Sequence, residues 1–317
     1  MKLKKRPMRP VATWATRLSR QLVQLVRKNK SDASYAAANC MSVQRTVDGM
    51  GPDSPKIDAR AGARMVVNLS SAHVPGFCEA SAKGLARPYK NGYDLAALAQ
   101  ASGLSSPVSP SRLTVDAALP LPSSVAAKDV YFGAVELNGT GIRFYGDVCL
   151  VLRRDSVPRD TVVLDRNSYN LLRSPIREQI GALPATGQAA ARRHVASGWS
   201  GEWARDLGAI AAIKSVLSLG IRERRWTTGQ INEAVRSDED YLEVLKVNSF
   251  SASDLQEARV SASDAAHDAL VGSRLSSRPL PRLESLIWRN RRIRAEAALR
   301  NTQVPVRIMT SSGRTRD

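Results

Sequence analysis

The strongest strand signal in the chain is the stretch VYFGAVELNGTGIRFYGDVCLVLRRDSVPRDTVVL, residues 130–164. Its Val, Ile, Tyr and Phe side chains favour extended backbone, and turn-forming residues divide it into three segments. Strands are expected at 130–136, 142–152 and 161–164. Asn138-Gly139 predicts a tight turn between the first two, because glycine readily adopts the positive φ that such turns require. The first two strands are therefore expected to form a β-hairpin.

Shorter apolar segments on either side of this stretch extend the predicted sheet. Further strands are expected at 64–69, 241–247, 258–261 and 304–309. The spacing of Trp203, Leu207 and Ile210 predicts a long helix that ends at Gly220. Shorter helices are expected at 95–101, 228–235 and 283–299, whereas the prolines of 105–124 predict loop. This order of elements predicts an α+β fold with a central mixed or antiparallel sheet, flanked by helices and extended by basic helices at both termini.

The excess charge of the chain lies at its two ends. The formal net charge is +18 over 317 residues, and residues 1–31 and 274–317 together account for all of it. A protein that binds a polyanion gains affinity from each phosphate it neutralises. The pattern therefore favours binding to the phosphate backbone of DNA or RNA. Four regions are expected: a basic helical arm at 1–31, a linker at 32–62, a neutral α+β body at 63–273, and a basic helix with a tail at 274–317.

The amino-terminal arm has apolar and basic side chains on opposite sides of a predicted helix, over residues 11–26. Three interpretations remain open: an arm for nucleic acid, a membrane-surface or transit segment over 11–28, or a helix docked on the body. The cations expected to contact nucleic acid are Lys4, Lys5, Arg6, Arg17, Arg20, Arg27 and Lys28 in this arm, and Arg289, Arg291, Arg292 and Arg294 near the other end.

The cysteines and histidines of the sequence do not suggest a metal site. Cys40, Cys78 and Cys149 are far apart and match no zinc-ligand spacing, and the chain has only three histidines. No metal is therefore expected. Unpaired cysteines favour the cytoplasm or another reducing compartment. No run of about 18 apolar residues occurs, so no transmembrane segment is expected.

The common catalytic motifs are missing from the sequence, including GxxxxGK[ST], HExxH and GxSxG, and no GxGxxG joins a strand to a helix. These absences exclude a P-loop NTPase. Among acids within predicted strands, Glu243 stands out because it lies between Leu242 and Val244. A buried, unpaired carboxylate is costly. Glu243 therefore either has a function or faces solvent through simple alternation along the strand.

Short motifs around Glu243 resemble the ADP-ribosyltransferase superfamily, especially bacterial toxins that modify nucleic acids. One is the strand Glu243-Val244-Leu245 with its following loop and strand. Another is Tyr145-Gly146-Asp147 with the apolar strand after it, and a third is the triplet Asn167-Ser168-Tyr169. The resemblance covers residues 131–260.

In that family, a strand Arg or His and a central Ser, Thr or Tyr hold nicotinamide adenine dinucleotide (NAD), and a late-strand Glu contacts the ribose. The resemblance implies that Glu243 is catalytic and that Arg143, Ser168 and Tyr169 bind NAD, with Arg87 competing for the position of Arg143. Such chemistry requires no metal, because one carboxylate can stabilise the charge that develops on the ribose. A nucleic-acid substrate would give the basic ends a function.

Two other functions fit the same sequence features. Asp147, Asp165, Asp240 and Glu243 could hold Mg²⁺ for a nuclease. A neutral body with cationic arms also suits a non-enzymatic protein that packages nucleic acid, because such arms neutralise phosphates without reading bases. Glu243 separates the transferase from the packaging protein. A transferase needs Glu243 in a cleft beside an Arg and a hydroxyl group, whereas a packaging protein leaves it as a surface acid.

Overall fold

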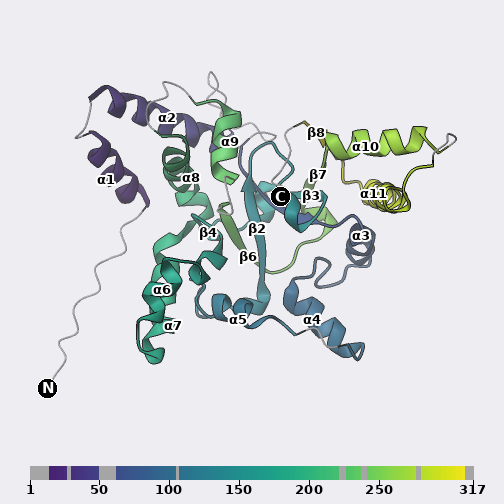
Figure 1. Cartoon of the computed structure of the whole chain (residues 1–317), viewed down its shortest axis with the longest axis horizontal. Coiled ribbons are helices and arrows are strands. Elements are labelled where there is room, and N and C mark those ends of the chain that lie inside the picture. The colour runs from purple at the N-terminus through teal and green to yellow at the C-terminus, as the bar shows by residue number, and fades with distance from the viewer. Residues whose placement is uncertain are drawn as a thin grey trace.

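A computed structural model describes residues 14–26, 30–49, 62–104, 107–220, 226–236, 241–275 and 280–310 of the chain. Within these residues, helices surround one mixed sheet of eight strands (Figure 1). The predicted α+β class with a central sheet flanked by helices is thus confirmed.

The sheet consists of β1 (Arg64–Leu69), β2 (Val130–Glu136), β3 (Val148–Leu152), β4 (Val162–Leu164), β5 (Ser200–Glu202), β6 (Glu243–Val247), β7 (Leu255–Ser261) and β8 (Val306–Met309). The helices are α1 (Trp14–Val26), α2 (Lys30–Asp48), α3 (Val74–Ala82), α4 (Gly92–Ala101), α5 (Pro110–Asp116), α6 (Ile176–Gly181), α7 (Ala185–Trp199), α8 (Trp203–Leu219), α9 (Thr228–Arg236), α10 (Ala262–Ser273) and α11 (Leu283–Asn301). Two short 3₁₀ helices also matter below: η2 (Arg143–Tyr145) and η4 (Ser168–Leu172).

The strand order, β5-β4-β6-β2-β1-β3-β7-β8, corrects the predicted hairpin. β1 lies between β2 and β3 and pairs antiparallel with both, and β3 begins only at Val148. The connection between β2 and β3 is not a tight turn, because it wraps around the carboxylate of Glu136. That carboxylate accepts backbone N–H groups from Leu137, Gly139 and Gly141 at 2.9–3.1 Å. The positive φ in this loop belongs to Gly141 rather than Gly139.

The main hydrophobic core lies on one face of the sheet, which we call the helix-covered face. Alternate strand residues such as Met65 and Val67 on β1 join it, together with residues of α2, α3, α8, α9 and α11. The intervening residue Val66 belongs to a separate small cluster on the other side. We call that side the pocket face. Side chains from these helices and Trp14 of α1 therefore bury one face of the sheet and leave the other for loops, α5 and a cavity.

The amino-terminal region packs closely on the body. Trp14 of α1 is buried, and its indole nitrogen donates to the carbonyl of Ser200 at 2.6 Å. The prediction of a linker at 32–62 is wrong for most of its length, because residues 30–48 form helix α2, which packs against α8. The reason is visible in its buried side chains, which recur at helical spacing: Ala36, Cys40, Val43 and Val47. Residues 50–61 lie outside the described part.

The carboxy-terminal region also belongs to the sheet-based body. β8 pairs in parallel with β7, and Ala295 and Leu299 of α11 enter the main core. The prediction of a loop at 105–124 is wrong in the middle of that segment, where residues 110–116 form α5. This helix has Ser109 as its cap and Pro110 in its first turn. Proline is tolerated there because the first helical N–H groups have no partner within the helix.

The long helix before Gly220 is confirmed as α8, which the glycine ends with a φ of 74°. α4 begins earlier than expected, at Gly92, because the side chain of Asn91 caps it. Among the described residues, no helix combines the length and the apolar character needed to cross a membrane.

Candidate active site

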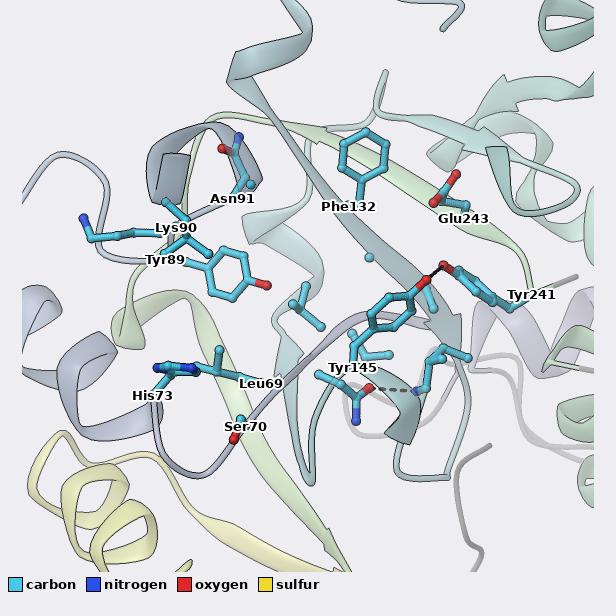
Figure 2. Close-up of a pocket in the computed structure, with 18 of the residues that line it drawn as sticks. Leu69, Ser70, His73, Tyr89, Lys90, Asn91, Phe132, Tyr145, Tyr241 and Glu243 are labelled. Carbon is cyan, nitrogen blue, oxygen red and sulfur yellow. Dashed lines mark hydrogen bonds between the residues drawn. The ribbon is translucent and has the colours of Figure 1, made fainter. Parts of the chain in front are cut away.

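A pocket of about 490 Å³ lies on the pocket face, within the usual size range of small-molecule sites (Figure 2). Strands β1, β2 and β6 form its floor. The start of α4, Arg112 of α5 and the 3₁₀ helices η2 and η4 contribute to its walls. The pocket is thus assembled from segments that are far apart in the sequence.

Glu243 projects from β6 into this pocket and is 3 % exposed. In the sheet it pairs with Leu164 of β4 on one side and Ala134 of β2 on the other. The prediction that alternation turns Glu243 toward solvent is therefore wrong, since both faces of the sheet are covered here. Its neighbour Ala134 is small, which leaves space above the floor.

Burial raises the pKa of Glu243, while the contact with Ser168 and the charge of Arg112 oppose that rise. The backbone N–H of Ser168 donates to Oε2 of Glu243 at 2.8 Å. Among the described residues that line the pocket, Glu243 is the only acid. The pocket wall thus contains one buried carboxylate, whose orientation is fixed by a backbone hydrogen bond.

Arg112 supplies a positive charge to this pocket. Its guanidinium lies 3.7 Å from the ring centroid of Phe132 and 5.6 Å from that of Tyr169. It also pairs with Asp116, one turn further along α5, whose other carboxylate oxygen accepts the hydroxyl of Tyr93 at 2.7 Å. Two rings and an acid therefore hold Arg112 in place, so that its charge acts on Glu243 without an exposed, mobile side chain.

Aromatic residues are concentrated in the pocket. Four of the seven tyrosines of the chain line it, together with Phe132: Tyr89, Tyr145, Tyr169 and Tyr241. The hydroxyls of Tyr145 and Tyr241 lie 3.3 Å apart, and Asn167 donates to the Tyr241 hydroxyl at 3.2 Å. Burial, and then the charge of Glu243, raises the pKa of Tyr241 well above its usual value. Tyr241 therefore stays a neutral phenol beside the acid.

The two ends of the pocket carry different polar side chains. Figure 2 shows Glu243 and Tyr241 at one end, and His73 and Lys90 at the other, with Tyr145 between them. Tyr89 lines the end that holds Lys90 and stacks on Phe250 at a centroid distance of 4.5 Å. The pocket thus offers Glu243 with the neighbouring charge of Arg112 at one end, Lys90 at the other, and aromatic walls, which suits an elongated ligand with rings and an anionic group.

The loop between β2 and β3, residues 137–147, forms one wall, and Asn68 holds it in place. The Asn68 amide donates to the carbonyls of Thr140 and Gly146, and its oxygen accepts the N–H of Ile142 at 2.7 Å. Gly146 is required for this fit, because a Cβ there would lie 2.2 Å from the carbonyl carbon of Leu69. The position of Tyr145 is therefore fixed by backbone contacts.

The structure brings together some of the predicted site residues and separates others. Glu243, Ser168 and Tyr169 meet, as expected of a shared site. Arg143 does not line the pocket, because it pairs with Asp264 of α10 at 2.5 Å. Arg87 is also elsewhere, paired with Asp94 and Asp129. The arginine near Glu243 is instead Arg112. The sequence did not suggest it as a site residue, because its segment was predicted to be a loop.

The acids considered for a nuclease do not converge. Asp147 accepts the N–H of Ser71 and lies 3.6 Å from Arg292, and Asp165 pairs with Arg166. Asp240 lies outside the described residues. Across the part of the chain that the structure describes, no group of three or more His, Cys, Asp or Glu side chains is placed to hold a metal ion. The described residues therefore offer no metal site that would support the nuclease hypothesis.

The predicted nucleic-acid-binding cations have different environments. Arg20, Arg291 and Arg294 are exposed. Arg292 is held by Asp268, and Arg289 donates to the backbone carbonyl of Asp268. Arg17 donates to the carbonyl of Gly198 and stacks over Trp14. Lys4, Lys5, Arg6, Arg27 and Lys28 lie outside the described residues.

Comparisons of the chain with protein-family models, with curated proteins and with solved structures gave no match. The chemistry of the pocket is therefore the basis for assigning a function.

Proposed function

We propose that this protein transfers ADP-ribose from NAD to a nucleic acid, with Glu243 as its catalytic residue. The observation that carries the proposal is the position of Glu243: a single buried carboxylate in a pocket lined by aromatic rings, beside the fixed charge of Arg112. The resemblance of the surrounding motifs to ADP-ribosyltransferases led to the same residue.

The two ends of the pocket suit the two kinds of group in the dinucleotide. Glu243 would contact the ribose that carries nicotinamide, and nearby tyrosines would stack on the flat nicotinamide ring. Lys90 and His73 would face the diphosphate from the other end of the pocket. NAD is a substrate in this scheme, because the reaction consumes it.

The transfer exchanges one bond to the ribose carbon C1′ for another. The bond from C1′ to the nicotinamide nitrogen breaks, and nicotinamide leaves as a neutral molecule with the bonding electron pair. A nucleophilic nitrogen or oxygen of the acceptor then bonds to C1′ and releases its proton to solvent. Positive charge develops on the ribose between these events, and the Glu243 carboxylate stabilises it.

Arg112, Ser168 and Tyr169 would act through Glu243 as positioning residues. The charge of Arg112 opposes protonation of the acid, and the N–H of Ser168 orients its carboxylate. Tyr169 adjoins the guanidinium of Arg112. Ser168 would therefore serve the reaction at one step removed from NAD, whereas Tyr169, which lines the pocket, would also contact it. Arg112 would take the place beside Glu243 that was expected for Arg143.

The acceptor half of the proposal depends on exposed cations at opposite sides of the molecule. Arg20 lies on α1, whereas Arg291 and Arg294 lie on α11, near the opposite edge of the sheet (Figure 1). These charges would attract a phosphate backbone to the protein without reading bases.

The experiment is to incubate the full chain with NAD and with single-stranded or duplex oligonucleotides. Chromatography measures released nicotinamide, and mass spectrometry measures ADP-ribose on the oligonucleotide. Glu243→Gln should lower both by about 100- to 1000-fold, which is the usual loss when an aligned electrostatic contact to a transition state is removed. Glu178→Gln, at an exposed acid of α6 that is remote in sequence from the proposed nucleic-acid-binding cations, is the matched control and should behave as the parent.

Two results would contradict the proposal. One is an absence of nicotinamide release by the parent protein, and the other is equal release by Glu243→Gln and the parent. If oligonucleotides nevertheless bind, the packaging function becomes the better account, because it requires the cations and not the pocket.

A further inference from the structure

We infer that Phe144 and Tyr145 form a stacking platform for an unpaired base of the nucleic-acid acceptor. This inference rests on the proposed function and deepens it, because it assigns the surface that presents the acceptor to Glu243. It starts from an unusual exposure: Phe144 is 49 % exposed and Tyr145 is 51 % exposed, although they are adjacent aromatic residues.

The two rings continue the aromatic lining of the pocket outward. The centroids of Phe144 and Tyr145 are 4.9 Å apart in an edge-on arrangement, and Tyr145 meets Tyr241 edge-on at 6.5 Å. Tyr145 and Tyr241 both line the pocket, whereas Phe144 does not. We call Phe144, Tyr145 and Tyr241 the aromatic track, since it runs from an exposed ring to the neighbour of Glu243. Figure 2 shows its inner part, with Tyr145 directed at Tyr241.

The platform is rigid, which lowers the entropic cost of holding a ligand. Arg143, at the start of η2, pairs with Asp264 of α10 at 2.5 Å. The backbone N–H of Tyr145 donates to the carbonyl of Ile142 at 3.0 Å, and Asn68 holds the carbonyl of Gly146. Arg143, which was expected to bind NAD, would thus have a different role as the anchor of this platform.

The charge of the neighbouring helix favours nucleic acid as the occupant. Asp147 follows the platform directly and lies 3.6 Å from Arg292 of α11. The same helix carries the exposed Arg291 and Arg294. A single strand needs aromatic surfaces for its bases and cations for its phosphates, and stacking on aromatic side chains tolerates any base. The aromatic track and α11 together provide both.

The test uses ten-nucleotide single strands of DNA and of RNA with a central 2-aminopurine, whose fluorescence falls when it stacks. The parent should bind and quench the probe. Phe144→Ala should bind at least about ten-fold more weakly and lose the quenching. Phe144→Trp keeps a ring and should retain both. Leu217→Ala removes a side chain of α8 that is 69 % exposed, and this control should match the parent.

A second measurement separates the platform from the transferase. Release of nicotinamide to water, without oligonucleotide, should be unchanged in Phe144→Ala because Phe144 does not line the pocket, whereas transfer to the oligonucleotide should fall. Equal affinity and equal quenching in Phe144→Ala and the parent would overturn the platform, even if NAD is consumed. Loss of quenching in Phe144→Ala, with no NAD consumption by the parent, would uphold the platform and contradict the proposed function.

Discussion

The backbone N–H of Ser168 donates a 2.8 Å hydrogen bond to the carboxylate of Glu243, across a separation of 75 residues in the sequence. This contact ties the short helix after β4 to the strand that carries the acid. A backbone donor costs no side-chain entropy when it is fixed. The orientation of Glu243 is therefore built into the sheet and the turn beside it.

Replacement of Glu243 by Gln should stabilise the protein at neutral pH. Because burial raises the pKa of Glu243 in the folded state, folding favours the neutral acid. The parent therefore loses stability as the pH rises through that pKa, and Glu243→Gln does not. Thermal melts of both proteins from pH 4 to pH 8 should show a higher melting temperature for the variant near pH 8 and a smaller difference near pH 4. A constant difference would contradict a raised pKa.

Arg112→Met should destabilise the protein by about 3 kcal/mol, because it leaves the buried Asp116 without its cation. Urea denaturation measures this loss. Adding Asp116→Asn should recover part of it, since the unpaired charge is then removed. The same Arg112 variant should move the pH profile of nicotinamide release to higher pH, because the charge of Arg112 lowers the pKa of Glu243. An unshifted profile would show that Arg112 serves stability alone.

Asn68→Ala should loosen the loop at 137–147, because three backbone groups lose their partner. The expected cost is about 2 to 3 kcal/mol. Hydrogen exchange should accelerate most at the amide of Ile142. Asn138→Ala changes an exposed residue of the same loop and is the control. If both variants exchange alike, Asn68 does not hold the loop.

Removal of the exposed end cations should weaken the binding of nucleic acid and reduce its salt dependence. In the variant Arg20→Gln, Arg291→Gln, Arg294→Gln, the slope of log affinity against log salt for a duplex should fall by about 2 to 3. The control removes three exposed arginines of the body, with Arg153→Gln, Arg159→Gln and Arg177→Gln. Equal slopes for the two variants would show that net charge, and not its position, determines binding.

Local patterns in the sequence were sufficient to find the sheet and its principal acid. The strands at 64–69 and 130–136 are as predicted, and Glu243 was identified by its apolar neighbours. The turn residues gave a wrong prediction where strands pair with a partner that is distant in the sequence. Asn138-Gly139 resembles a hairpin turn, but the competing partner is β1, about 70 residues earlier. Only the assembled sheet decides between those pairings.

Arg112 was missed because two prolines obscured a seven-residue helix. Pro107 and Pro110 suggested loop, yet Ser109 before Pro110 is a recognisable helix start. The tyrosines around the pocket carried no local signal, since they come from separate segments between residues 89 and 241. Their shared role emerges only when β1, β2 and β6 become neighbours.

The hydrogen bond from the indole of Trp14 to the carbonyl of Ser200 has a consequence for handling the protein. Ser200 belongs to β5, the outermost strand on its side of the sheet. Gly201 leaves room for the indole, since a Cβ there would lie 2.7 Å from it. An uncovered outer strand invites association with other chains. Proteolytic trimming through residue 26 should therefore produce protein that aggregates.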